Sequence, residues 1–404
     1  MSIAIYTLTS ALHDEETVSK STHEFLDSLH LDFEWKGADF IDYGKAPLNI
    51  IYVRTGGTEG LFLQLFDELR QRSHHPFYFL TSGKSNSLAA SMEILSFLRQ
   101  QGSEGEIIHG TSQYITHRIQ LLDRVEKAYH SLSGCRLGII GQPSDWLIAS
   151  HADKQKVFEQ LNIELVDVPM EELLTAIDRA PETLPINLKP QISHYKSQAS
   201  NLKGAAQIYH ALKTIVEKYH LAGFTLRCFD LLTSVHNTGC LALAMLNAEG
   251  IVAGCEGDVP AMLSMKVAQV ITGTMGFQAN PANINTVSGH IIFAHCTIPL
   301  NMVERFELDT HFESGIGVGI RGYVPPGPVT IFKLSGDLSR SFIAEGSLIE
   351  CQDKPDLCRT QLLVQLADPS QTSYFFSHPI GNHHIILPGH HKDVLEQLCT
   401  KYIQ

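Results

Sequence analysis

The sequence predicts an α/β protein with two Rossmann-like, doubly wound parallel-sheet domains followed by a β-rich, barrel-like C-terminal domain. Up to about residue 275, apolar strand-like runs alternate with small-residue loops and helix-like stretches, as in βαβ units. After that point, short apolar or alternating runs are broken by Gly, Pro and Asp, which is typical of a barrel or sandwich. Because 404 residues exceed one ordinary core, we predict domains at 1–133, 134–275 and 276–404.

The first 130 residues contain two predicted strand–loop–helix units. The strand "NIIYVR" (49–54) leads through "TGGTEG" into a helix, and "FYFL" (77–80) leads through "TSGKSNS" into another. Loops that follow parallel strands are where ligands bind in open α/β sheets. "TGGTEG" could hold an anion, but it lacks the ending of a Walker loop, so a plain turn is favoured. Ser87 stands where a hydroxyl can cap the second helix, and no G-x-S-x-G elbow predicts a serine nucleophile.

The second α/β domain is predicted from "CRLGIIG" (135–141) onward. The elements expected after this strand are a helix at 152–161, the strand "IELVDV", an irregular stretch at 181–199, a helix at 200–221, the strand "FTLRCFD" (224–230), a helix at 236–248, the strand "IVAGCEGD" (251–258) and a helix at 260–272. In the C-terminal domain, "HIIFAHCTIP", "GIGVGIRGYV", "PVTIFKLSG", "RSFIAEGSLIE" and "TQLLVQLAD" are expected to be mainly β, before a final helix "KDVLEQLCTKYI".

Composition narrows the class of protein and of partner. A formal charge of −13 argues against nucleic acid or an anionic membrane as a partner. No apolar run approaches the roughly 20 residues of a membrane helix, and no basic leader precedes the first apolar residues. Eight cysteines without a C-x-x-C pair indicate a reducing compartment, so a cytoplasmic location is expected.

Acidic and histidine-bearing segments nominate a metal site. "CEGD" puts Glu256 and Asp258 directly after an apolar strand, where a buried carboxylate needs a cation or hydrogen bonds. Taken alone, the pattern favours Asp258 as a helix cap and a solvated Glu256. His295 lies in the apolar run "FAHCTIP", and "GNHHIILPGHH" supplies four histidines late in the chain. Carboxylate and imidazole donors together are the makings of a divalent metal site.

In these segments the chain resembles the L-fucose isomerase and L-arabinose isomerase superfamily. The resemblance rests on "CEGD" (255–258), "PANINT" (281–286), "FAHCTIP" (293–299) and "GNHH" (381–384), in that order. It implies a metal-dependent aldose–ketose isomerase that works through a cis-enediol intermediate, with a sugar substrate and Mn²⁺ as the expected ion. By the resemblance, Glu256 is a ligand and acid/base, and His383 is the terminal ligand with His384 as its substitute.

The chain departs from the family's second carboxylate, which falls at Asn283. An amide oxygen can ligate a metal but cannot act as a general base, and cation binding should be weaker. We therefore expect Glu256, Asn283, His295 and His383 at the metal, with Glu256 and Asp258 as the acid/base pair. Asp230 is a further candidate acid, although a strand-end cap describes it equally well. Substrate binding is assigned to the three residues His384, Asp230 and Ser87.

Two other readings stay open at this stage. One is a non-catalytic or repurposed carbohydrate-binding protein, which Asn283 favours. The other is a nucleotide-dependent enzyme using the Gly loops at 55–60 and 138–141, which the absence of a complete phosphate fingerprint disfavours. The resemblance also implies a homo-oligomer, a hexamer or trimer, in which "TGGTEG" and "TSGKSNS" could serve the sugar of a neighbouring subunit.

Overall fold

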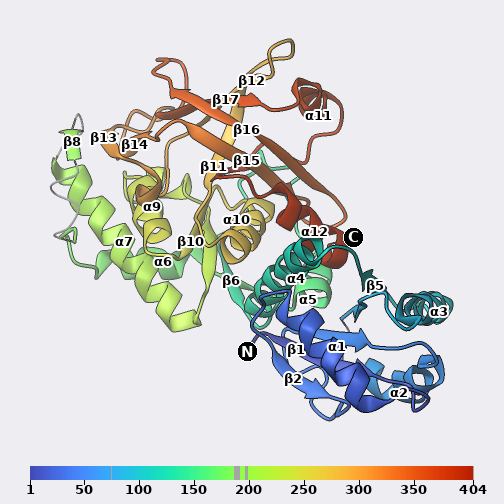
Figure 1. The fold of residues 1–404 in the computed structure, drawn as a ribbon. Coiled ribbons are helices and arrows are strands. Elements are labelled where there is room, and N and C mark those ends of the chain that lie inside the picture. Colours follow the sequence, from blue (N-terminus) through green and yellow to red (C-terminus); the bar gives the residue numbers. More distant parts are fainter. Residues whose placement is uncertain (74, 186–191, 196–198, 404) are drawn as a thin grey trace. The chain divides into compact units, whose positions relative to one another are not determined.

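The computed structural model describes residues 1–73, 75–185, 192–195 and 199–403. The chain divides into two compact units, Met1–His130 and Ser131–Gln404. The first holds one parallel sheet, and the second holds another parallel sheet together with a closed barrel (Figure 1). The predicted fold class is therefore confirmed, whereas the division of residues 134–404 into two domains stays a prediction.

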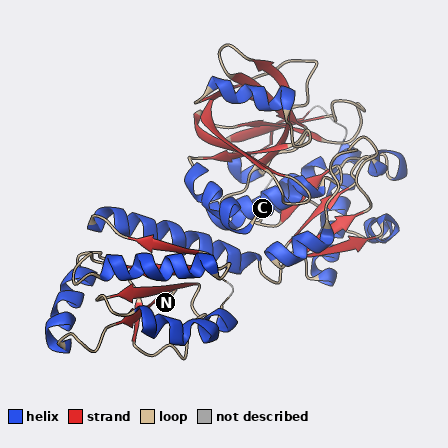
Figure 2. Cartoon of the chain, turned by 90° about the vertical axis from the view of Figure 1, so that its right-hand side faces the viewer, coloured by secondary structure: helices blue, strands red, loops and turns tan. Residues whose placement is uncertain are grey.

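The first unit is doubly wound. Its five strands are parallel in the order β2-β1-β3-β4-β5. The strands are β1 (Ile3–Leu8), β2 (Glu34–Gly37), β3 (Leu48–Val53), β4 (Phe77–Leu80) and β5 (Gly105–Ile108), and the helices are α1 (Glu15–Asp27), α2 (Glu59–Arg72), α3 (Ser87–Gln100) and α4 (Ser112–Leu132). Apolar side chains of α2 and α3 cover one face of the sheet and those of α1 and α4 the other. Figure 2 shows helices on both sides of this sheet. Burial on both faces explains why these strands read as continuous apolar runs.

The parallel sheet of the second unit has the order β10-β9-β6-β7. Its strands are β6 (Arg136–Ile140), β7 (Glu164–Val168), β9 (Gly223–Leu226) and β10 (Val252–Cys255), and its helices are α5 (Lys154–Leu161), α6 (Met170–Asp178), α7 (Ala199–Tyr219), α8 (Asp230–Ser234), α9 (Cys240–Ala248) and α10 (Val259–Thr272). The predicted helix at 236–248 begins only at Cys240, and the short α8 was not expected. None of the described helices is long and apolar enough to span a bilayer.

The barrel closes in the order β11-β12-β17-β16-β15-β18. Its strands are β11 (Phe277–Asn285), β12 (His290–His295), β15 (Gly327–Leu334), β16 (Ser341–Cys351), β17 (Thr360–Leu366) and β18 (His384–Pro388). A side sheet joins β13 (Arg305–Asp309) to β14 (Gly319–Tyr323) and to β8 (Ile192–Tyr195), and the remaining helices are the short α11 (Ser373–Ser377) and the terminal α12 (Lys392–Tyr402). β8 falls within the stretch 181–199 that was expected to be irregular. It forms because a strand more than a hundred residues later pairs with it; residues 186–191 and 196–198 lie outside the described part.

Helix α10 joins the parallel sheet to the barrel. It packs against β9 and β10 on one side and against β15 and β18 on the other (Figure 1). All of its residues from Val259 to Ala268 are buried, because both sides are covered. One apolar cluster accordingly runs from the parallel sheet into the barrel. The segments before α10 and at the ends of β12 and β18 are thereby brought together, and they carry the candidate site.

Candidate metal centre

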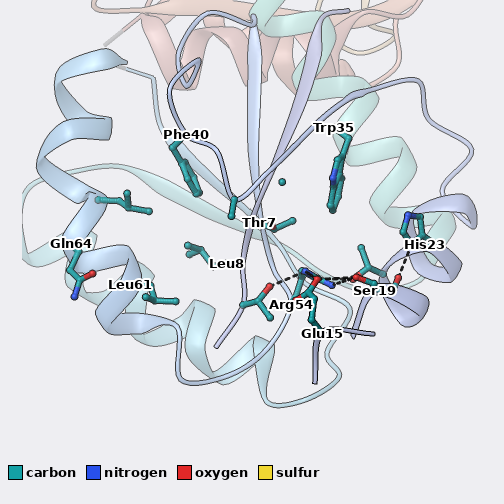
Figure 3. Close-up of a pocket in the computed structure, with 15 residues that line it drawn as sticks. Thr7, Leu8, Glu15, Ser19, His23, Trp35, Phe40, Arg54, Leu61 and Gln64 are labelled. Atoms are coloured by element: carbon teal, nitrogen blue, oxygen red, sulfur yellow. Dashed lines mark hydrogen bonds and ion pairs between the residues drawn. The ribbon is translucent and has the colours of Figure 1, made fainter. Parts of the chain in front are cut away.

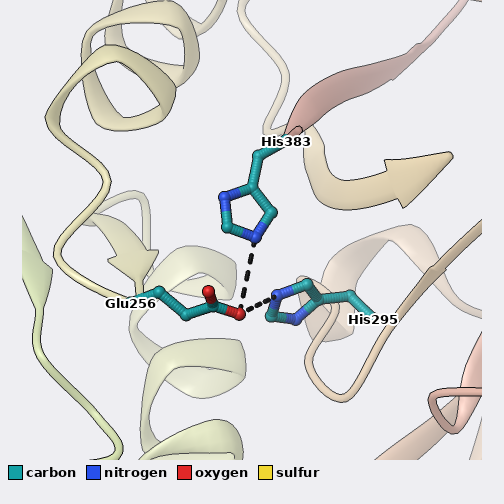
Figure 4. Close-up of side chains that lie close together, drawn as sticks. All are labelled: Glu256, His295 and His383. Atoms are coloured by element: carbon teal, nitrogen blue, oxygen red, sulfur yellow. Dashed lines mark ion pairs between the residues drawn. The ribbon is translucent and has the colours of Figure 1, made fainter. Parts of the chain in front are cut away.

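Three buried side chains from distant parts of the second unit converge. Glu256 follows β10, His295 ends β12, and His383 precedes β18. Nε2 of each histidine lies 3.5 Å from Oε1 of Glu256 (Figure 4). One ligand atom from each residue lies within 4.8 Å of the others, a group that could hold a metal ion. Three residues proposed from sequence as ligands are thus neighbours in space.

The turn after β10 aims the carboxylate of Glu256. Glu256 and Gly257 both have positive φ, +63° and +70°. For a non-glycine residue this left-handed backbone is strained, and such strain concentrates at functional sites. The carbonyl oxygen of Glu256 accepts a hydrogen bond from Ser144 N at 3.0 Å. Its Oε2 accepts one from Trp146 Nε1 at 2.8 Å, so Oε1 alone faces the two histidines.

Asp258 lies behind His383. As the N-cap of α10 it accepts a hydrogen bond from Ala261 N through Oδ1 at 2.8 Å. Its Oδ2 lies 2.8 Å from His383 Nδ1 and 3.6 Å from Nζ of the buried Lys333. A carboxylate that holds one nitrogen of a histidine fixes the ring's orientation and leaves the other nitrogen to ligate.

The electrostatics of the cluster favour an ionised carboxylate. Burial alone would raise the pKa of Glu256, but His383 and His295 hold that pKa well below its ordinary value. Burial likewise opposes the charge on Asp258, yet Lys333 and His383 lower the pKa of that carboxyl. Burial would lower the pKa of His383, but Glu256 and Asp258 raise it to about 9. The carboxylates therefore stay ionised, and positive charge beside them stabilises their ionised form.

The chemistry of the donor atoms fits a divalent cation. Among the described residues, His383 Nε2 is buried with no hydrogen-bond partner, although buried polar atoms normally have one. A cation held by Glu256, His295 and His383 would satisfy that nitrogen. Two imidazoles and one carboxylate are a common ligand set for transition metals and zinc. This donor set does not single out one metal.

His384 points elsewhere. Its Nε2 lies 3.0 Å from the hydroxyl of Tyr374, and its Nδ1 lies 3.0 Å from the carbonyl oxygen of Asn382. Burial lowers its pKa to about 3, so the ring is neutral. His383 and His384 are neighbours in an extended segment, where successive side chains point to opposite sides. The structure therefore brings only the first of them to the cluster.

Asn283 is not brought to the cluster. It is exposed on β11 and pairs with Ile292, three residues before His295 on β12. Asn280 lies nearer that end of the strand, opposite Ala294, and accepts a hydrogen bond from Asn382 Nδ2 at 3.0 Å. The structure thus departs from the assignment of Asn283 as a ligand, because the antiparallel register carries that residue toward the β11–β12 hairpin.

Asp230 and Ser87 lie outside the triad. Asp230 begins α8 and pairs with Arg227 Nε at 3.0 Å. Arg227 also donates to the carbonyl oxygen of Pro143 at 2.7 Å, which ties Asp230 to the loop that carries Trp146. Ser87 belongs to the other unit, where its buried hydroxyl lies 2.6 Å from Thr81 Oγ1. A role for either residue in binding substrate stays a prediction.

Several side chains around the centre were not anticipated. Trp146 stacks edge-on against Phe229 with ring centroids 4.7 Å apart, and Phe229 contacts His311 at 5.5 Å. Burial lowers the pKa of His311 to about 4. Lys333 lies in the apolar run "TIFKLSG". A single lysine within an apolar strand was the feature that could have indicated a buried charge. Trp146 lies in the loop between β6 and α5, which follows the carboxyl end of a parallel strand, where ligands usually bind.

Comparisons with known proteins agree with an isomerase. No protein-family model matches the chain. It is 22% identical over 298 residues to the sulfoquinovose isomerase of Clostridium sp. (strain MSTE9), and the aligned region covers 69% of this chain and 66% of that protein. It is 21% identical over 328 residues to the sulfoquinovose isomerase of Priestia aryabhattai, covering 78% and 73%. A third, from Alkalicoccus urumqiensis, is 21% identical over 270 residues, covering 63% and 58%. These similarities support the L-fucose/L-arabinose isomerase-like superfamily at low identity and indicate an isomerase enzyme.

Proposed function

We propose that this protein is a metal-dependent aldose–ketose isomerase whose centre is Glu256, His295 and His383. The observation that carries the proposal is the buried convergence of these three ligand atoms. Similarity to several sulfoquinovose isomerases supports the reaction class. A divalent cation bound there would stabilise negative charge developing on the oxygens of an open-chain sugar. Mn²⁺ remains our proposed ion, and the homo-oligomeric state and cytoplasmic location remain proposals as well.

Glu256 is the group we assign to proton transfer. Its pKa is held below the ordinary value, so it is available as a base at neutral pH. In an aldose the proton leaves C2, and in the ketose a proton is added at C1. These carbons are adjacent and share one face of a cis-enediol, so one carboxylate can move the carbon-bound proton between them, while the hydroxyl proton of O2 passes to O1. No second Asp or Glu joins the triad among the described residues.

Asp258 takes a different role from the acid/base role expected from sequence. Both of its oxygens are engaged, by the start of α10 and by His383 and Lys333. We assign it to positioning His383. Trp146 keeps one oxygen of Glu256 in place, so the other is directed at the centre. Pre-aligned groups of this kind lower the reorganisation that a reaction requires.

The test is isomerase activity of the full-length protein over a panel of sugars. L-Fucose, L-arabinose and sulfoquinovose are each incubated with Mn²⁺, Co²⁺ or Zn²⁺, and ketose formation is followed by NMR. Glu256→Gln keeps the shape but loses the base, and we expect kcat to fall by about 100-fold or more. Glu304→Gln, an exposed carboxylate, is the matched control and should turn over like the unaltered protein.

The alternative is a carbohydrate-binding protein that has kept the centre without catalysis. The specific observation in its favour is the single carboxylate at the triad. Metal-dependent sugar binding without turnover of any panel member would establish that alternative. If Glu256→Gln turned over at the unaltered rate, our assignment of the base would be wrong. If the protein showed neither sugar binding nor turnover with any of the three metals, the isomerase proposal would be overturned.

A further inference from the structure

The first unit contains its own pocket, at the point where the strand order reverses. β1 and β3 are neighbours at the centre of the sheet, and their connections run to opposite faces. Crevices at such a switch point, beyond the carboxyl ends of the strands, are the usual ligand sites of doubly wound sheets. Here the pocket has a volume of about 590 Å³, in the range typical of small-molecule sites. All of its lining residues belong to this unit, from Thr7 to Leu65.

One side of the pocket is aromatic. Trp35, in β2, is 45% exposed despite its size, and Figure 3 shows it across the pocket from Phe40. Phe40 is buried and stacks on Tyr6 at 5.1 Å, which holds it in place. Leu61 of α2 adds an exposed aliphatic side chain to the lining. Exposed aromatic and aliphatic surface in a concave site favours a ligand with an apolar face.

The other side of the pocket is polar and rigid. Arg54, directly after β3, is buried and donates through Nε to Thr22 Oγ1 at 2.9 Å and through one terminal nitrogen to Glu15 at 2.8 Å. Further hydrogen bonds reach Thr9 and Ser19 (Figure 3). The guanidinium is thus fixed beside a carboxylate and several hydroxyls. The charges of Arg54 and Glu15 cancel, and together with the hydroxyls these groups offer a ligand both hydrogen-bond donors and acceptors.

The charges at the pocket exclude a phosphate as the preferred ligand. In folds of this order an anion binds at the N-terminus of the first helix, where backbone N–H groups are free. In α1 that position is taken by Asp14, which accepts a hydrogen bond from Thr17 N, and by the acidic Glu15 and Glu16 in the first turn. Three carboxylates there repel an anionic group. The buried guanidinium of Arg54 in the lining disfavours a cation in the same way, so the ligand that fits is uncharged.

We propose that this pocket binds an uncharged sugar ring. The apolar face of the ring lies on Trp35, and its hydroxyls reach the polar groups around Arg54, including Glu15 and His23. His23 uses Nδ1 on the carbonyl oxygen of Ser19 at 2.8 Å, so its Nε2 is the nitrogen that a ligand can reach. Gln64, exposed on α2, adds an amide to the rim. This site is separate in composition from Glu256, His295 and His383, and it requires no metal.

The chain offers a direct fluorescence test because it has only two tryptophans. In full-length Trp146→Phe protein, Trp35 is the sole indole and reports on the pocket. Neutral aldoses and glucose 6-phosphate are titrated into this variant after EDTA treatment. We expect a saturable change in Trp35 fluorescence with at least one neutral sugar, and binding at least 10-fold weaker for the phosphorylated one.

Calorimetry of the otherwise unaltered chain supplies the matched variants. In EDTA, Trp35→Leu should weaken sugar binding by about 10-fold or more, in line with the loss of a stacking surface. Leu12→Ala, at an exposed position outside the pocket lining, should leave binding unchanged. Absence of any neutral-sugar response overturns the proposal. So does a response that needs added metal and disappears in Glu256→Gln, because it would then come from the metal centre.

Discussion

At the scale of single residues, the metal centre depends on how each histidine nitrogen is used. His383 gives Nδ1 to Asp258 and turns Nε2 toward Glu256, whereas both nitrogens of His384 meet partners away from the cluster. The motif "GNHH" therefore contains one ligand and one buried structural histidine. Asp258 decides which nitrogen of His383 is available, although it lies outside the triad itself.

Asp258→Asn tests this positioning role. Asparagine caps a helix about as well as aspartate, so α10 should keep its start. The charged acceptor for His383 is lost, and we expect metal affinity to fall by about 10- to 100-fold. The measurement is calorimetric titration of the metal-free protein with Mn²⁺, Co²⁺ and Zn²⁺. Asp14→Asn, at the N-cap of α1, is the matched control and should bind metal normally. Unchanged affinity in Asp258→Asn would refute the role.

At the scale of elements, the turn between β10 and α10 has almost no freedom. Gly257 combines a positive φ with close packing, since a Cβ there would lie 2.5 Å from the carbonyl oxygen of Gln142. Gly273 ends the same helix with a similar φ of +74°, but a Cβ there would meet no atom within 4 Å. The two glycines flank one helix. Gly257 combines left-handed backbone strain with a steric conflict, whereas Gly273 has the backbone strain alone.

Alanine at these two positions should have unequal effects. Gly257→Ala adds overpacking to the left-handed strain, and we expect a loss of about 2–5 kcal/mol in unfolding free energy. Gly273→Ala carries only the conformational part, about 1–2 kcal/mol. Differential scanning calorimetry of both variants measures the difference. Equal destabilisation would mean that the loop at Gln142 yields to the added methyl group.

At the scale of the whole molecule, the centre links segments that are far apart in sequence. Glu256, His295 and His383 follow or precede β10, β12 and β18, so one cation would join the parallel sheet to two barrel strands. All three belong to the unit Ser131–Gln404. A metal that binds the folded state therefore stabilises this unit, by about 2.7 kcal/mol when present at 100 times its Kd.

Metal removal should consequently lower one thermal transition. With Mn²⁺, Co²⁺ or Zn²⁺ at about 100 times its Kd, we expect the Tm of the second unit to rise by roughly 5–10 °C over the EDTA-treated protein. His383→Ala should abolish this increase, while His378→Ala, an exposed histidine, should retain it. Calorimetry with and without metal checks this. An equal increase in His383→Ala would place the bound cation elsewhere.

Periodicity and local sequence context were sufficient to predict much of the fold and part of the candidate site. The alternation of apolar runs with small-residue loops predicted the parallel sheets, and the change of texture near residue 275 predicted the barrel. Glu256 and His295 were nominated from their place after or within apolar runs, where a polar group needs a partner, whereas His383 was nominated from the histidine-rich segment "GNHHIILPGHH" and from the family resemblance. These are local properties, since each depends on a side chain and its immediate neighbours along the chain.

Only the tertiary structure decided which candidates meet. The register of β11 on β12 carries Asn283 away from His295. Closure of the barrel directs His383 toward Glu256 and Asp258, while His384 faces Tyr374. The pairing of Lys333 with Asp258 joins residues 75 positions apart, which no spacing rule connects. The sequence by itself determined which elements form and which residues need partners. The partners came from strand register and barrel closure, because these depend on contacts between segments that are distant along the chain.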